Sequence, residues 1–170
     1  GNHNVTQRRI PRIRILNRAP GTARTIINVD ELAHALHDRL GMPVAITYFD
    51  DTDFEYQVGT MAETDILISP HGAQLGSLPF LPDCSQVLEF FPPQYWIPGF
   101  YGSLAQAGGS EYYYLYFSDG DKWNETEVTA NSHRARVETR RHQFCAPLEP
   151  TLNVVDQMVR NWHSCCDQID

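Results

Sequence analysis

The 170-residue sequence contains no apolar run close to the roughly 20 residues that a membrane-spanning helix needs, so no membrane span is expected. Neither a G-x-G-x-x-G motif nor a phosphate-loop motif occurs in it, which removes two common nucleotide-binding fingerprints. The cysteine spacings match no zinc pattern. The net charge of −8 and the absence of a recognised motif argue against nucleic acid as a partner. The composition is that of an ordinary globular domain, with 42% hydrophobic and 20% charged residues.

The most informative stretch is residues 64–92. Short apolar runs at 65–69 and 86–91 are typical of buried parallel strands. Between them, His71-Gly72-Ala73 forms a turn in which small residues let the backbone approach a ligand closely. A short helix is expected to follow over 74–80. Because a turn from a parallel strand into a helix N-terminus is a common anion site, this stretch predicts one.

Three charged side chains fall near this turn in the predicted sheet. Arg18 and Arg24 flank the loop after the first strand, at the same sheet edge, and arginine binds phosphate oxygens in bidentate fashion. Glu89 is an acid within an apolar strand, and a buried carboxylate is costly unless it is bonded. It could accept both hydroxyls of a ribose. The alternative for Glu89 is a structural hydrogen bond accepted from a neighbouring N–H. His71 could donate to a phosphate, or it could be satisfied by the backbone of its own turn.

Short strands and helices alternate along the chain, which predicts an α/β fold with a Rossmann-like parallel sheet and helices on both faces. We expect one domain over residues 1–170. The expected strands are 12–17, 43–49, 65–69, 86–91 and 111–117. The expected helices are 31–40, 53–63, 74–80, 95–107 and 151–163. Residues 118–144 are polar and predict a long surface loop, and the acidic run 50–53 is expected to cap a helix rather than to bind a metal.

Cysteines and sequons both bear on location. An even number of cysteines permits two disulfides with three connectivities, and adjacent cysteines normally bond to different partners. The four cysteines are Cys84, Cys145, Cys165 and Cys166. Candidate N-glycosylation sites are Asn4 and Asn124. The residues after Gly1 do not resemble a signal peptide, as expected of a mature or truncated chain. Together, the cysteines and sequons predict the lumen of the secretory pathway (ER or Golgi) or the extracellular space.

The stretch from Asp65 to Pro92 resembles glycosyltransferase family 61, which includes secretory-pathway O-linked N-acetylglucosamine transferases and plant xylosyltransferases. The family pattern DILIxxHGAxLxxxxFLPxxxxVLExFP is met at Asp65, Ile66, Leu67, Ile68, His71, Gly72, Ala73, Leu75, Phe80, Leu81, Pro82, Val87, Leu88, Glu89 and Pro92. Upstream, Asn17-Arg18, Arg24 and the segment 27–32 are similar to the family's arginine-containing loop and the helix start after it. Phe54, Gln57 and Val58 are similar to its FxxQV helix. The resemblance covers about residues 12–92.

The resemblance implies a two-domain GT-B glycosyltransferase in which two Rossmann-like halves face each other and the C-terminal half binds the donor. This chain is similar to that donor half only. The implied ligands are a UDP-sugar carrying an N-acetylglucosamine-like or xylose-like sugar, and a glycan or glycoprotein acceptor. A second domain or chain would complete the cleft, and neither metal nor other cofactor is expected. The implied donor-binding residues are Arg18, Arg24, His71, Gly72, Ala73 and Glu89.

No catalytic base for an inverting transfer can be assigned in these residues, since such a base must reach the acceptor hydroxyl. Two alternatives therefore stay open. The domain could serve as a non-catalytic structural or interaction module of an extracellular or cell-surface glycoprotein assembly. It could also be an unrelated α/β nucleotide-binding domain.

Overall fold

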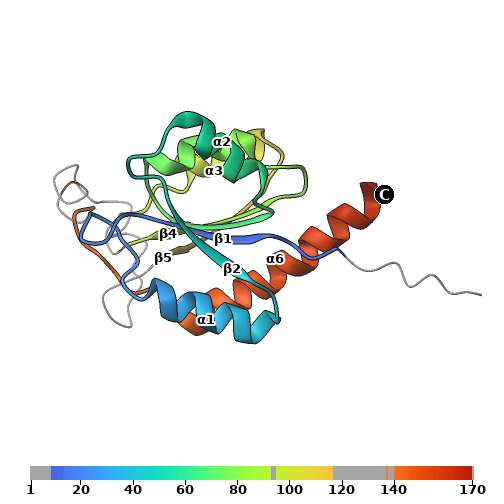
Figure 1. Ribbon diagram of the computed structural model, residues 1–170, viewed down its shortest axis with the longest axis horizontal. Coiled ribbons are helices and arrows are strands. Elements are labelled where there is room, and N and C mark those ends of the chain that lie inside the picture. The colour runs from blue at the N-terminus through green and yellow to red at the C-terminus, as the bar shows by residue number, and fades with distance from the viewer. Residues whose placement is uncertain (1–8, 93–94, 117–136, 138–139, 170) are drawn as a thin grey trace, which may run out of the picture.

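The computed structural model describes residues 9–92, 95–116, 137 and 140–169. It contains a five-stranded parallel sheet with strand order β2-β1-β3-β4-β5, which confirms the predicted fold class. The sheet lies between two layers of helices (Figure 1). The strands are β1 (Ile13–Asn17), β2 (Val44–Tyr48), β3 (Ile66–Pro70), β4 (Gln86–Phe91) and β5 (Glu111–Tyr116). Every residue of β3 and β4 is buried, as expected for central strands covered on both faces.

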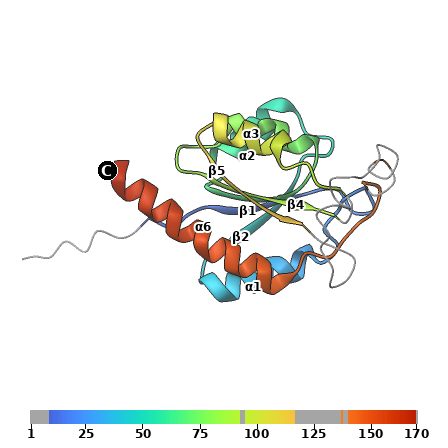
Figure 2. The ribbon, with the colours of Figure 1, turned by 180° about the vertical axis from the view of Figure 1, so that it is seen from behind.

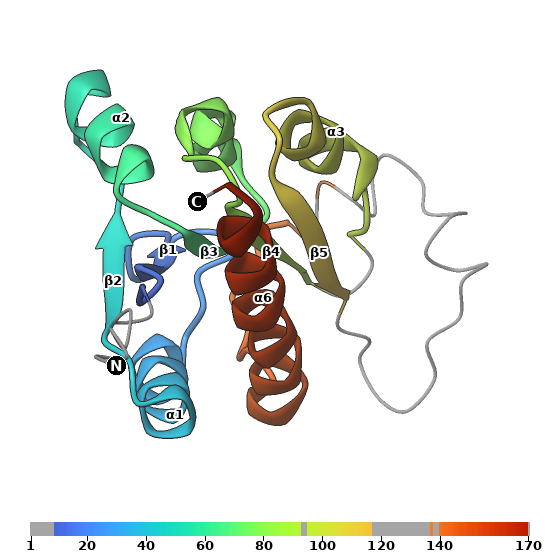
Figure 3. The same cartoon turned by 90° about the vertical axis from the view of Figure 1, so that its right-hand side faces the viewer.

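Helices cover the two faces of the sheet (Figure 3). On one face lie α1 (Val29–Leu40) and α6 (Leu148–Ile169), which run beside each other in the view from behind (Figure 2). On the other lie α2 (Phe54–Ala62), the 3₁₀ helix η1 (Ala73–Phe80) and α3 (Gly99–Ala107). Each layer buries its own apolar cluster against the sheet. No helix in the described part of the chain is both long enough and apolar enough to cross a bilayer.

Local sequence explains where the helices of the first half begin and end. Asp53 caps α2 by accepting a hydrogen bond of 2.8 Å from the Tyr56 backbone N–H, so the acidic run does serve as a cap. Gly41 ends α1 in the left-handed conformation, with φ of 64°, and its N–H donates to the carbonyl of His37. Asn28 precedes α1, but its side chain exchanges two hydrogen bonds with the backbone of Ala146 instead of capping the helix.

Two helices have different bounds from those expected. α3 begins at Gly99 rather than near Tyr95, because a proline disfavours helical geometry at the residue before it and Pro98 therefore delays the start. α6 runs from Leu148 to Ile169, beyond both expected ends of 151–163. Pro150 is tolerated there because it lies in the first turn, where backbone N–H groups have no helical acceptor.

A disulfide between Cys84 and Cys165 joins the segment before β4 to the C-terminal part of α6. The other two cysteines differ in exposure, with Cys145 exposed and Cys166 buried. The predicted sequons at Asn4 and Asn124 and most of the predicted loop 118–144 lie outside the described residues. At the end of that loop, Phe144 forms a β-bridge with Ile26.

Candidate functional site

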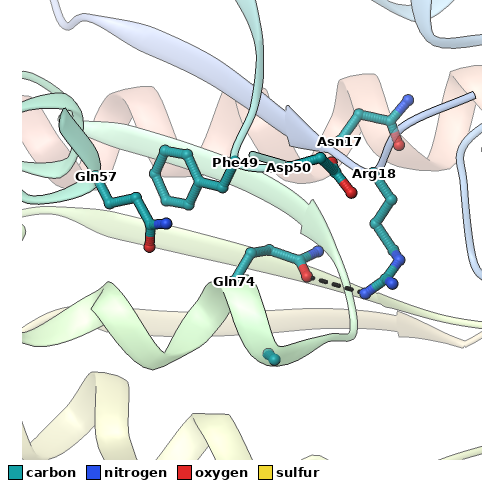
Figure 4. A pocket seen from close by; sticks show the side chains of 7 residues that line it. Asn17, Arg18, Phe49, Asp50, Gln57 and Gln74 are labelled. Carbon is teal, nitrogen blue, oxygen red and sulfur yellow. Dashed lines mark hydrogen bonds between the residues drawn. The ribbon is translucent and has the colours of Figure 1, made fainter. Parts of the chain in front are cut away.

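The carboxyl ends of β1, β2 and β3 border a cavity of about 270 Å³ (Figure 4). In the strand order of this sheet, the chain leaves β1 towards one face and β3 towards the other. Open α/β sheets bind ligands in the crevice at such a switch point. The cavity is lined by Asn17, Arg18, Phe49, Asp50, Gln57, Ala73 and Gln74. The topology therefore brings the predicted arginine loop and the 71–73 turn to one edge.

The loop after β1 is held closed by a buried asparagine. The Asn17 side chain donates to the Ile26 carbonyl at 3.0 Å and accepts from the Ile26 N–H at 2.9 Å. Within the loop, Thr25 Oγ1 donates to the Ala19 carbonyl at 2.8 Å. Arg24 has a φ of 61°, which is uncommon for a residue other than glycine. Such conformations persist only where the surroundings impose them, and they cluster at functional sites.

Arg18 and Arg24 bring two positive charges to this edge without a carboxylate partner among the described residues. Arg18 Nη1 donates to Gln74 Oε1 at 3.3 Å. The Nε atoms of both arginines are buried and have no hydrogen-bond partner in the described part of the chain. Burial, and then the neighbouring charge of Arg18, lower the pKa of Arg24. An anion placed between the two guanidinium groups would satisfy their unpaired N–H donors and offset their repulsion.

Gly72 provides the space in which the Arg18 side chain meets Gln74. A Cβ atom at Gly72 would lie 2.8 Å from Arg18 Nη1 and 2.4 Å from Gln74 Oε1. Ala73 follows, begins η1 and lines the cavity. A residue without a side chain therefore lets the guanidinium lie directly against the backbone of the turn.

His71 and Glu89 lie together behind this edge rather than open to it. Glu89 is fully buried and His71 is 4% exposed. His71 Nδ1 lies 2.5 Å from Glu89 Oε1, and the Tyr112 hydroxyl donates to Glu89 Oε2. Burial and the Glu89 charge raise the pKa of Tyr112. Each oxygen of Glu89 thus has a protein partner in this arrangement.

The second ring nitrogen of His71 also has a protein partner. Its Nε2 lies 3.2 Å from the hydroxyl of Tyr95, in the segment after β4. The ring is surrounded by aromatic side chains, with ring centroids 5.3 Å away for Phe91, 4.9 Å for Tyr95 and 5.1 Å for Tyr101. This geometry matches the internally satisfied histidine considered from the sequence.

Residues 1–88 of the 170 match the family profile described as glycosyltransferase 61. The chain belongs to the glycosyltransferase 61 family. It is 32% identical over 110 residues to protein O-linked-mannose beta-1,4-N-acetylglucosaminyltransferase 2 of Tetraodon nigroviridis, a match over 62% of this chain and 18% of that protein. The protein of the same name in Homo sapiens is 33% identical over 96 residues, covering 54% of this chain and 16% of the relative. The match spans less than a fifth of either relative.

Some residues at the site of this glycosyltransferase 61 chain were not assigned from sequence. Gln74 and Asp50 line the cavity, and the Asp50 carboxylate accepts a hydrogen bond of 3.0 Å from the Ala19 N–H of the arginine loop. Each follows the end of a parallel strand by a few residues, and this position could have identified both residues as site candidates from the sequence. Tyr95 and Tyr112 carried no such signal, because their contacts with the His71–Glu89 pair exist only once β3, β4 and β5 are side by side. In the described part of the chain, no cluster of three histidine, cysteine or acidic side chains is placed to hold a metal ion.

Proposed function

We propose that this chain is the donor-binding part of an inverting glycosyltransferase, with the diphosphate of a UDP-sugar bound over Arg18 and Arg24. The proposal is carried by the buried Nε atoms of Arg18 and Arg24, which have no hydrogen-bond partner in the described part of the chain. Arg18 lines the cavity at the switch point, and Arg24 lies in the same loop after β1. Family membership supports glycosyl transfer as the reaction class. The names of the relatives make N-acetylglucosamine the first donor sugar to test and a protein-linked glycan the first acceptor; a xylose-like sugar is the next.

The chemistry of such a donor explains what fixed arginines would contribute. As the glycosidic bond breaks, negative charge develops on the leaving diphosphate, and preorganised cations stabilise that charge more in the transition state than in the ground state. Two arginines can supply this stabilisation without a divalent metal. Activation of the acceptor hydroxyl needs a base within hydrogen-bond reach. We assign that base and the facing wall of the cleft to a second domain or chain, as in a GT-B arrangement.

We also propose a location in the secretory pathway lumen or outside the cell. The Cys84–Cys165 disulfide supports this location, because such bonds persist in oxidising compartments and are rare in the cytosol.

Isothermal titration of the full chain with UDP tests donor binding directly. We expect saturable binding of one UDP per chain, weakened by Arg18→Ala and by the double replacement Arg18→Ala with His71→Ala. Absence of binding would contradict the proposal and favour the non-catalytic structural module. Binding that both variants leave unchanged would place the nucleotide elsewhere on the chain.

Gly72→Ala offers a test of the space beside Arg18. The added methyl group would meet the ends of two flexible side chains, Arg18 and Gln74, so we expect the fold to tolerate it while the guanidinium is displaced. Losing one charge-assisted contact costs about 1.5 kcal/mol, or roughly tenfold in UDP affinity. Gly76→Ala is the matched control, because a Cβ there meets nothing within 4 Å. Equal affinities for the two variants would show that the space at Gly72 is not needed.

A further inference from the structure

A hydrogen-bonded line of side chains crosses the buried end of the sheet and stops beside Arg24. It runs from Tyr112 on β5 to Glu89 on β4, then to His71 after β3, and ends at the hydroxyl of Tyr95. Glu89, His71 and Tyr95 are 0%, 4% and 8% exposed, so the inner part of the line is shielded from bulk water.

The Tyr95 end of the line adjoins the anion site. Arg24 Cζ lies 5.8 Å from the centre of the Tyr95 ring, within the range of a cation–π contact. The Arg24 Nε is one of the two buried donors without a partner in the described residues. Tyr95 therefore lies between the Arg24 guanidinium on one side and the His71 ring on the other. A phosphate bound by Arg24 would come next to this tyrosine.

The direction in which the Tyr95 hydroxyl donates depends on whether His71 Nε2 carries a hydrogen. With Glu89 ionised, its carboxylate only accepts, and the hydrogen of the His71–Glu89 contact is then carried by His71 Nδ1. When the imidazole is neutral, its Nε2 is a bare acceptor, and the Tyr95 hydroxyl must donate inward. When the imidazole is protonated, Nε2–H donates to the tyrosine oxygen. The hydroxyl hydrogen of Tyr95 is then free to point outward.

We propose that Tyr95 is a phosphate-binding residue of the nucleotide-sugar site, and that its hydroxyl turns outward to the diphosphate when His71 takes up a proton from solvent as the ligand binds. This inference rests on the proposed donor-binding function. Glu89, fully buried behind His71, is the group that stabilises the imidazolium. Tyr112 in turn holds the second oxygen of that carboxylate.

The charges around His71 explain why its protonation should be coupled to ligand binding. His71 contacts Glu89 from β4, Tyr95 after β4 and Tyr101 from α3, and Tyr112 from β5 lies behind Glu89. Arg24 lies on the other side of the Tyr95 ring, and the charges of Arg18 and Arg140 act on Arg24. Without ligand, the two arginines oppose a third positive charge. A diphosphate brings negative charge to the same place and removes that opposition. Binding of the anion and uptake of the proton therefore favour each other.

The test is calorimetric titration of the full chain with UDP-N-acetylglucosamine, a diphosphate diester without a phosphate that titrates near neutral pH. Runs in buffers of different ionisation enthalpy report protons exchanged on binding. We expect net proton uptake by the wild type. For Tyr95→Phe we expect loss of that uptake and an affinity about tenfold lower, the effect of one hydrogen bond to a charged group. Tyr113→Phe is the matched control and should behave as the wild type, because that hydroxyl contacts Glu111 and Asn161 on the α6 side.

Two results would overturn the inference while leaving the proposed function intact. One is wild-type binding whose enthalpy is independent of the buffer, which needs no variant and so holds even if Tyr95→Phe does not fold. The other is folded Tyr95→Phe, verified by circular dichroism, that binds as tightly as the wild type. If the wild type itself binds neither UDP nor the UDP-sugar, the proposed function fails instead.

Discussion

Replacing Arg18 and Arg24 together with alanine is expected to weaken UDP binding by at least about a hundredfold. In the proposed site each arginine would contribute a charge-assisted contact worth about 1.5–3 kcal/mol, and the two would sum to about 3 kcal/mol or more. The fold should survive, because neither side chain belongs to the apolar clusters that hold the sheet and its helices together. Isothermal titration of both proteins with UDP at one fixed salt concentration measures the effect.

A matched control separates local contacts from overall charge. Arg39→Ala with Arg160→Ala also removes two positive charges, on α1 and α6. Both side chains are exposed there, and Arg39 pairs at the surface with Asp156 at 3.0 Å. This control should bind UDP nearly as the wild type does, since screened charges at a distance contribute little. If the two double variants lose affinity equally, the arginines act only through net charge and the proposed site is wrong.

The parallel sheet was predictable because its strands carry their own local signals. β3 and β4 are short apolar runs bounded by turn residues, and each is buried along its whole length. The juxtaposition of the two segments at the cavity followed from the same information, since parallel strands end at one edge and Arg18 and His71 each follow a strand. Sequence therefore sufficed to place the loop after β1 beside the 71–73 turn.

The hydrogen-bond partners of His71 and Glu89 were not predictable from the sequence. Their partners depend on which residues β5 and the segment after β4 bring near them. In the sheet register Glu89 lies opposite Tyr114, yet it bonds Tyr112, which is one of several similar tyrosines in a strand. No local pattern distinguishes them. The disulfide is a similar case, because three connectivities were compatible with the spacing and only the position of α6 selects Cys84 with Cys165.

The buried His71–Glu89 pair links the proposed binding site to the stability of the fold. Each side-chain oxygen and nitrogen of His71 and Glu89 has a protein partner, and the pair lies behind the turn that reaches the cavity. Their effect on a ligand would be exerted through the position and hydrogen-bond direction of Tyr95 and through the turn that carries Gly72. The pair must therefore be tested first for what it does to the fold.

Glu89→Ala is expected to lower the free energy of unfolding by about 3–5 kcal/mol. Removing one member of a buried, hydrogen-bonded pair leaves the other without compensation. Here the His71 N–H and the Tyr112 hydroxyl would both lose their acceptor inside the core. Urea unfolding monitored by circular dichroism measures the change, with Glu55→Ala on the exposed side of α2 as a control that should change stability by less than about 0.5 kcal/mol.

A second measurement identifies the cause of the loss. The Glu89 carboxylate is one reason, after burial, that the pKa of Tyr112 is raised, so Glu89→Gln should let Tyr112 ionise at lower pH than in the wild type. Ultraviolet absorbance of tyrosinate during an alkaline titration reports this shift, with Tyr112→Phe identifying the signal. A stability change as small as that of Glu55→Ala, together with an unchanged titration, would mean that Glu89 is not the acceptor on which His71 and Tyr112 depend. A large loss with the expected shift would establish the carboxylate as the centre of the buried line.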